Sequence, residues 1–139
     1  RVLVYRDLVA ADRNPDTRTP SRSLELHLTG NMERYMWWFD GVKMSDIKAP
    51  IPFTKGERVR VTLVNDTMMN HPIHLHGMNF QVIASNTRTV TPLISDTYLV
   101  LPDEKVQLAL VADNPGDWVL HCHIIEHQKT GMTSYIRVT

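Results

Sequence analysis

The chain has 139 residues, enough for one domain with its own hydrophobic core and, at most, an additional arm. Fifteen Lys and Arg balance 15 Asp and Glu, and no apolar run approaches the roughly 20 residues of a membrane span, so neither a nucleic-acid partner nor a membrane span is expected. The single cysteine excludes an internal disulfide. The absence of an initiator Met and of a signal peptide indicates an excerpt or a processed product.

The first 23 residues are predicted to be a linker or an arm from a preceding domain. Residues 1–6 (RVLVYR) are typical of a short strand or of the end of a connection. Residues 10–23 are polar and contain Pro15 and Pro20, which is the composition of a surface loop. We therefore predict that the folded domain comprises residues 24–139.

Short runs with strand patterning, separated by turns, make up the rest of the chain. Leu24, Leu26 and Leu28, for example, alternate with polar residues, the period of a half-buried strand. The predicted strands are residues 24–29, 35–39, 51–54, 58–64, 80–84, 98–101, 105–111, 117–120 and 133–138. Only residues 124–129 are predicted to form a short helical turn. This pattern predicts an all-β sandwich or barrel.

The stretch from His121 to Met132 (HCHIIEHQKTGM) contains the only cysteine and three of the seven histidines. Cys122 is followed by His127 five residues later and by Met132 ten residues later. Two histidines and a cysteine with a weak axial methionine form a blue-copper electron-transfer site, because thiolate and thioether stabilise Cu(I) and imidazole binds both oxidation states. This stretch supplies one histidine, so the second must come from elsewhere.

A second histidine-rich stretch, residues 71–77 (HPIHLHG), offers that ligand. Alternate side chains of a strand point to opposite faces. His74 and His76 therefore share one face, whereas His71, three residues before His74, faces the other way. By the same rule Cys122 faces away from both of its neighbours, His121 and His123.

Two neighbouring sites follow when these strands are brought together. The mononuclear site comprises His71, Cys122, His127 and Met132, and the opposite face carries His74, His76, His121 and His123. An electron that leaves the Cys122 thiolate then has a short covalent route to its neighbours. We predict that Cys122, His121 and His123 form the electron path between the two sites.

The motifs HPIHLHG and HCHIIEHQKTGM resemble the paired copper signatures of the C-terminal cupredoxin domain of multicopper oxidases. This family includes laccases, ferroxidases and bacterial copper-resistance oxidases, and the chain resembles its bacterial members. All eight ligand spacings match, and the resemblance extends from about Tyr35 to Thr139. It implies a Greek-key cupredoxin β-sandwich for residues 24–139, with a short helical turn near the copper-binding loop.

The resemblance also implies an oxidase that uses copper as its cofactor. Type 1 copper would accept single electrons from a reductant and pass them to a trinuclear cluster that reduces O₂ to water. The implied ligands are His71, Cys122, His127 and Met132 for type 1 copper, His74 for type 2 copper, and His76, His121 and His123 for the type 3 pair. A periplasmic or secreted location is implied as well. The reductant is left open among phenols, Fe(II), Cu(I) and Mn(II).

Two departures from the family pattern affect these expectations. Some bacterial relatives carry an acid after the last type 1 histidine, but this chain has Gln128, so protons must be delivered by another group. Relatives also complete the trinuclear cluster with four histidines from a different domain, and only His27 remains here. We therefore expect the chain alone to be inactive and to require another cupredoxin domain, from the same polypeptide or from a neighbouring subunit.

Other classes of function explain fewer of these residues. The main alternative is a stand-alone blue-copper electron-transfer cupredoxin without oxidase activity, but such a shuttle needs none of the opposite-face histidines. A zinc site does not require Met132. A copper-storage protein does not need the cysteine and axial geometry, and a copper nitrite reductase has no role for His123. Asn65-Asp66-Thr67 matches an N-glycosylation sequon, which means little in a bacterial protein.

Overall fold

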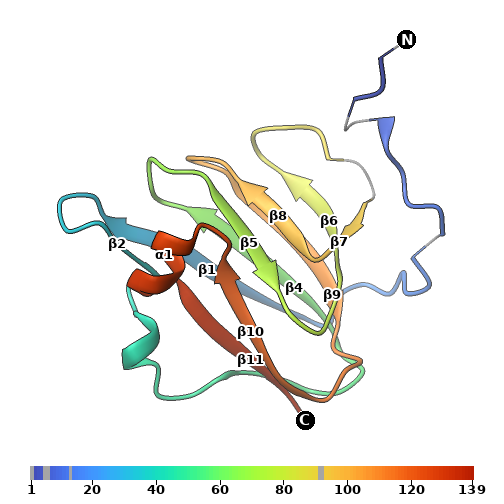
Figure 1. Ribbon diagram of the computed structural model, residues 1–139. Coiled ribbons are helices and arrows are strands. Elements are labelled where there is room, and N and C mark those ends of the chain that lie inside the picture. The colour runs from blue at the N-terminus through green and yellow to red at the C-terminus, as the bar shows by residue number, and fades with distance from the viewer. Residues whose placement is uncertain (1, 5–6, 13, 91–92) are drawn as a thin grey trace.

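Two β-sheets pack face to face in the computed structural model, which describes residues 2–4, 7–12, 14–90 and 93–139 (Figure 1). One sheet has the order β2-β1-β4-β9-β6-β7, and the other has the order β3-β11-β10-β5-β8. The first sheet comprises β1 (Arg22–Asn31), β2 (Met36–Phe39), β4 (Arg58–Asn65), β6 (Phe80–Ser85), β7 (Ile94–Ser95) and β9 (Lys105–Val111). The second comprises β3 (Ile51–Phe53), β5 (His71–Leu75), β8 (Thr97–Val100), β10 (Gly116–Cys122) and β11 (Thr133–Val138). A 3₁₀ turn, η2 (Met44–Asp46), and one short helix, α1 (Ile125–Thr130), complete the described elements.

The core lies between the two sheets because alternate residues of their strands are apolar. β4 buries Val59, Val61 and Leu63, and β9 buries Val106 and Leu108 among others. These strands lie side by side and antiparallel, with Val61 opposite Leu108. Burial of such side chains stabilises the fold by about 2 kcal/mol each. The prediction of an all-β sandwich with one short helical turn is confirmed.

The predicted strands agree closely with the observed ones. Each of the nine strands predicted over residues 24–138 is present, and none of its bounds differs by more than two residues. The helical turn predicted at 124–129 is α1, shifted by one residue. The short strand β7 was not predicted. Of the strand suggested at residues 1–6, residues 1, 5 and 6 lie outside the described part, and residues 2–4 belong to no strand.

Part of the predicted arm is bonded to the body of the domain. The Asn14 amide donates to Gln81 Oε1 at 2.9 Å, and the Arg58 guanidinium donates to the carbonyl oxygen of Asp16. Arg18 Nη2 donates to the carbonyl oxygen of Gly56 at 3.0 Å. Residues 14–18 therefore lie against the domain, ahead of β1.

The pairing of β5 with β10 sets the position of both histidine-rich stretches. These strands are antiparallel, with His121 opposite His74 and Cys122 opposite Ile73. α1 follows β10 and is capped at its C-terminus by Gly131, whose φ of 134° lies in a region that favours glycine. A Cβ at Gly131 would also lie 2.8 Å from the carbonyl oxygen of Trp37. The chain can therefore reverse here and return Met132 to the end of β10.

Candidate metal centre

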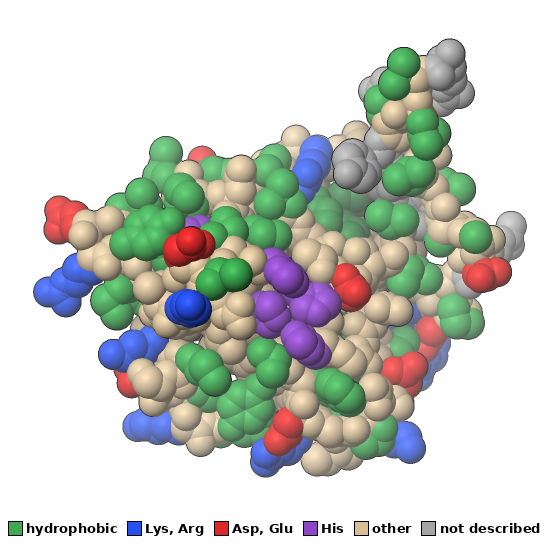
Figure 2. All heavy atoms as spheres, in the orientation of Figure 1, with side chains coloured by type: hydrophobic (Ala, Val, Ile, Leu, Met, Phe, Trp, Pro, Cys, Tyr) green, Lys and Arg blue, Asp and Glu red, His purple; other side chains and the backbone are tan. Residues whose placement is uncertain are grey.

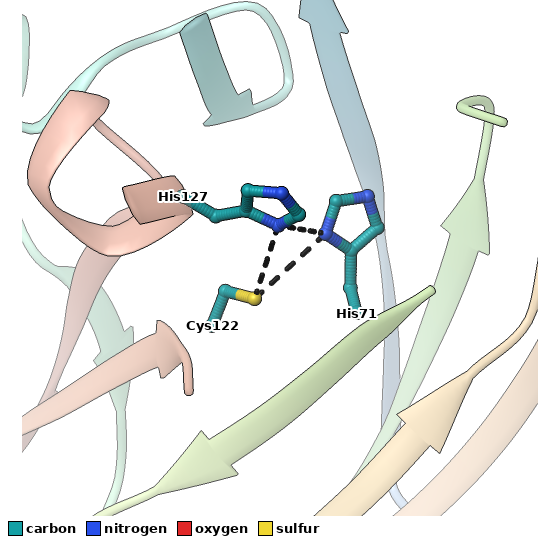
Figure 3. Close-up of side chains that lie close together, drawn as sticks. All are labelled: His71, Cys122 and His127. Atoms are coloured by element: carbon teal, nitrogen blue, oxygen red, sulfur yellow. Dashed lines mark hydrogen bonds between the residues drawn. The ribbon is translucent and has the colours of Figure 1, made fainter. Parts of the chain in front are cut away.

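Three buried side chains from three different elements converge at one end of the sandwich (Figure 3). His71 comes from the start of β5, Cys122 from the end of β10 and His127 from α1. Cys122 Sγ lies 3.8 Å from His71 Nδ1 and 3.6 Å from His127 Nδ1. The two Nδ1 atoms lie 3.1 Å apart. All three side chains are fully buried.

The spacing of these atoms fits a trigonal metal ion. With bond lengths of about 2.0 Å to nitrogen and about 2.3 Å to sulfur, as for zinc, a planar trigonal arrangement gives N···S distances of about 3.7 Å and an N···N distance of about 3.5 Å. The observed N···S distances match, and the N···N distance is shorter by a few tenths of an ångström. Two imidazoles and a thiolate are the equatorial donors of a type 1 copper site. The donor set therefore fits copper.

Burial prepares both imidazoles to act as neutral ligands. It lowers the pKa of His71 to about 4, with a further contribution from His127, and it also lowers the pKa of His127. Both rings are therefore neutral at pH 7. Burial raises the pKa of the Cys122 thiol to about 11. A metal ion that binds here must therefore displace a proton from sulfur.

Met132 follows His127 by five residues and is fully buried. Its N–H donates to the carbonyl oxygen of His127 at 3.0 Å, and its carbonyl oxygen accepts the N–H of Cys122 at 3.1 Å. These two bonds close the loop that carries Cys122 and His127. The backbone of the predicted fourth ligand is thus tied to two of the other three.

Aromatic side chains from the β2 region form a wall of the site that the sequence did not reveal. The Trp37 ring is fully buried and lies 4.3 Å from the His127 ring and 5.2 Å from the His71 ring, measured between centroids. Tyr35 packs edge-on against Trp37, and its hydroxyl lies 3.4 Å from His127 Nε2. The only sequence signal was the aromatic-rich run 35–39. Trp38, the next residue, is only half-buried.

A second histidine group lies on the opposite face of β5 and β10. Figure 2 shows histidine side chains gathered on an open face of the molecule. The ligand atoms of His74, His76 and His121 all lie within 4.8 Å of one another, and the Nε2 atoms of His76 and His121 are 3.1 Å apart. The His123 ring lies 5.5 Å from the His74 ring and 5.4 Å from the His121 ring. The structure thus brings all four predicted histidines together.

Hydrogen bonds fix which nitrogen these histidines present. His74 Nδ1 lies 3.0 Å from the carbonyl oxygen of Asp96, and His121 Nδ1 lies 2.9 Å from the carbonyl oxygen of Cys122. A carbonyl oxygen only accepts, so each Nδ1 carries the hydrogen and each Nε2 lone pair is free. His74 and His121 of the second histidine group therefore present their Nε2 atoms.

His27 lies outside both groups, as expected for a surface histidine. Its ring is partly exposed and lies 2.5 Å from an Asp66 carboxylate oxygen and 3.2 Å from one of Glu25. The bond to Asp66 raises the pKa of His27. Gln128, at the position where some bacterial relatives carry an acid, is half-buried on α1. No helix among the described residues is long and apolar enough to cross a membrane.

Comparison with known proteins gives the same picture. The family model described as multicopper oxidase matches residues 17–139. Copper resistance protein A homolog from Pseudomonas syringae pv. tomato is 46% identical over 138 residues, which cover 99% of this chain and 23% of that protein. Copper resistance protein A from Escherichia coli is 45% identical over 138 residues, which cover 99% of this chain and 22% of that protein. The chain therefore spans less than a quarter of these relatives.

Solved structures share the fold. A multicopper oxidase from Pseudomonas thermotolerans superposes with a TM-score of 0.79 and 34% identity, over 91% of this chain and 31% of that one. McoA multicopper oxidase from Aquifex aeolicus gives a TM-score of 0.82 and 27% identity, over 93% of this chain and 32% of that one. The cupredoxin fold expected from the motifs is confirmed.

Proposed function

The chain belongs to the multicopper oxidase family, and we propose that residues 24–139 are the C-terminal cupredoxin domain of a copper-dependent oxidase. Residues 1–23 are then the linker or arm from a preceding domain. The observation that carries this proposal is the pair of histidine groups on opposite faces of β5 and β10. A single residue, Cys122, belongs to one group and is covalently joined to members of the other.

In this proposal the buried group is the type 1 copper site. His71, Cys122, His127 and Met132 would hold the copper ion. When bound, copper alternates between Cu(II) and Cu(I) and so supplies one-electron chemistry. The two neutral imidazoles require no proton loss to bind, and their burial with Trp37 excludes water. Exclusion of water keeps the ligand set rigid during electron transfer.

The second histidine group is half of a trinuclear copper site. His74 is the type 2 ligand, and His76, His121 and His123 serve the type 3 pair. With copper in both sites, electrons from a one-electron reductant would pass from Cys122 through the adjacent peptide bonds to His121 and His123, and four electrons with four protons would reduce one O₂ to two waters. The remaining ligands come from another cupredoxin domain of the same polypeptide or of a neighbouring subunit. A hollow of about 790 Å³ beside His74 and His76 supports this, because it leaves room for incoming side chains.

The stand-alone electron-transfer cupredoxin has no comparable support. Such a shuttle has no use for four clustered histidines, two of which, His76 and His121, place their Nε2 atoms 3.1 Å apart. We further propose a periplasmic or secreted location, in keeping with relatives named copper resistance protein A. The reductant is a one-electron donor such as a phenol, Fe(II), Cu(I) or Mn(II).

The shared cluster predicts that the 139-residue chain, loaded with copper, will not consume O₂ steadily. The full-length oxidase, which would contain this chain and the domain that supplies the other four histidines, will do so. An oxygen electrode with a common reductant measures both rates, and Cys122→Ser in the full-length oxidase gives the inactive control. Steady oxygen consumption by the chain alone would contradict the proposal.

The axial role of Met132 predicts a higher reduction potential in Met132→Leu. Thioether sulfur suits Cu(I), but as an additional electron donor it stabilises the more electron-poor Cu(II) still more, so its loss favours Cu(I), while the thiolate-to-copper band should persist. Leucine has a similar volume, so the fold should lose less than about 1.5 kcal/mol. Met78→Leu is the matched control, because Met78 is also a buried methionine but lies outside the ligand set. A potential that moves equally in both variants, or in neither, would argue against an axial Met132.

A further inference from the structure

The Asn65-Asp66-Thr67 sequence at the end of β4 is buried rather than displayed on the surface. Asn65 is 1% exposed and Thr67 is 8% exposed. The Asn65 side-chain amide donates to the carbonyl oxygen of Met69 at 2.8 Å and to that of Val100 at 3.3 Å. A glycan on this nitrogen would have no room. The motif therefore has a different use from the one that its sequence pattern suggests.

The amide bonds of Asn65 fix the direction in which its oxygen points. Because the nitrogen faces two carbonyl oxygens, Oδ1 faces Thr67. It accepts the backbone N–H of Thr67 at 3.0 Å and lies 2.8 Å from Thr67 Oγ1. An amide oxygen cannot donate, so the hydrogen between these two oxygens belongs to the Thr67 hydroxyl.

The Thr67 hydroxyl has one hydrogen and several neighbours. Oγ1 lies 2.7 Å from His71 Nε2 and 3.3 Å from the carbonyl oxygen of Met69. If its hydrogen pointed at His71, the oxygens of Asn65 and Thr67 would face each other at 2.8 Å with no hydrogen between them. The other arrangement satisfies every group. The hydroxyl donates to an oxygen, and Oγ1 accepts a hydrogen from His71 Nε2.

We infer that Asn65 and Thr67 act as positioning residues that hold His71 in the tautomer with hydrogen on Nε2. The Nδ1 lone pair is then free, and this is the atom that lies 3.8 Å from Cys122 Sγ and 3.1 Å from His127 Nδ1. A hydrogen bond from the distal ring nitrogen is a common way in which proteins orient a metal-binding histidine. Asn65 and Thr67 thus prepare the buried site before a metal arrives. The inference rests on the proposed function only where it names copper as that metal.

The tautomer can be measured on the copper-free chain. Nitrogen-15 NMR at pH 7 distinguishes an imidazole with hydrogen on Nε2 from one with hydrogen on Nδ1. In the wild-type chain we expect His71 to be in the Nε2–H form alone. Thr67→Val keeps the shape but removes the acceptor, so the Nδ1–H form should appear. Thr67→Ser restores the hydroxyl and should restore the single tautomer. Thr62→Val, the same exchange at a buried threonine of β4, is the matched control and should change nothing at His71.

Copper titration supplies the second readout. We expect Cu(II) affinity at the buried site to fall roughly tenfold in Thr67→Val and to recover in Thr67→Ser, the size of effect usual for the loss of such a supporting bond. An Nδ1–H form of His71 in the wild-type chain would overturn the inference, even if no variant folds. So would a Thr67→Val chain that keeps both the tautomer and the affinity. If His71 is in the Nε2–H form but bound copper shows no thiolate-to-copper band, the proposed function fails while the tautomer assignment stands.

Discussion

Replacing Cys122 with serine will leave the copper-loaded chain colourless. The intense absorption of a type 1 site arises from charge transfer between a thiolate and Cu(II), and a hydroxyl oxygen at the same position provides no such transition. Because Cys122 is the only cysteine of the chain and its Sγ lies 3.8 Å from His71 Nδ1 and 3.6 Å from His127 Nδ1, we expect complete loss of the band. Absorption and electron paramagnetic resonance spectra after loading with Cu(II) measure it.

Two controls separate loss of the ligand from loss of the fold. His27→Gln removes a histidine that lies in neither group and should keep the full band. Cys122→Ser places a hydroxyl in a fully buried position, which costs about 1–3 kcal/mol, so its thermal unfolding must be compared with that of the wild-type chain. A wild-type chain that binds copper without colour would contradict the type 1 assignment itself.

Glu104→Gln will strongly lower the stability of the fold, at a site outside the metal centre. The Glu104 side chain is fully buried and accepts hydrogen bonds from the hydroxyls of Ser85 and Tyr98, at 2.6 and 2.9 Å. The Arg88 guanidinium donates to both carboxylate oxygens at 3.1 Å, and the Leu101 N–H donates at 2.8 Å. A glutamine would turn an NH₂ group towards these donors. We expect a loss of about 3 kcal/mol in the free energy of unfolding, measured with urea.

The pH dependence of this effect follows from the direction of the pKa shift. Burial alone would raise the pKa of Glu104, but the hydrogen bonds from Leu101, Ser85, Arg88 and Tyr98 outweigh it and leave the pKa below its usual value. The carboxylate therefore contributes its stability above roughly pH 4.3, the value for an unfolded chain, and loses it as the pH falls through the folded pKa. The difference between wild-type and Glu104→Gln should narrow in acid.

A matched control for Glu104 is Glu33→Gln, the same exchange at an exposed glutamate. It should change the free energy of unfolding by less than about 0.5 kcal/mol. Equal effects of the two substitutions would show that the buried network contributes nothing.

Glu104 also matters for the metal centre, since its hydrogen bonds with Ser85 and Tyr98 join β6 of one sheet to β8 of the other. β8 in turn pairs with β5, where Val100 lies opposite His71.

The sequence by itself determined the chemistry of both histidine groups. The alternation of side chains along an extended strand is a local property of the backbone, so it separates His71 from His74 and Cys122 from its neighbours before any packing is known. The same local rule, with turn residues, predicted nine strands to within two residues. Cys122, His127 and Met132 lie within eleven consecutive residues, so their spacing is also a local property of the sequence.

The tertiary structure alone decided what surrounds these ligands. Three of these contacts join residues that are distant in the chain. Cys122 lies opposite Ile73, and the Trp37 ring packs against His127. Glu104 forms hydrogen bonds across the two sheets. Thr67 is near His71 in sequence, but only the folded turn brings its hydroxyl to 2.7 Å from His71 Nε2. Only the fold also places the Asn65 amide where it donates to the carbonyl oxygen of Val100. Such contacts depend on how the sheets twist and pack, and no local pattern records that. The ligands can therefore be predicted from the sequence, whereas tertiary contacts determine which nitrogen each buried histidine presents to the metal and how rigidly its ring is oriented.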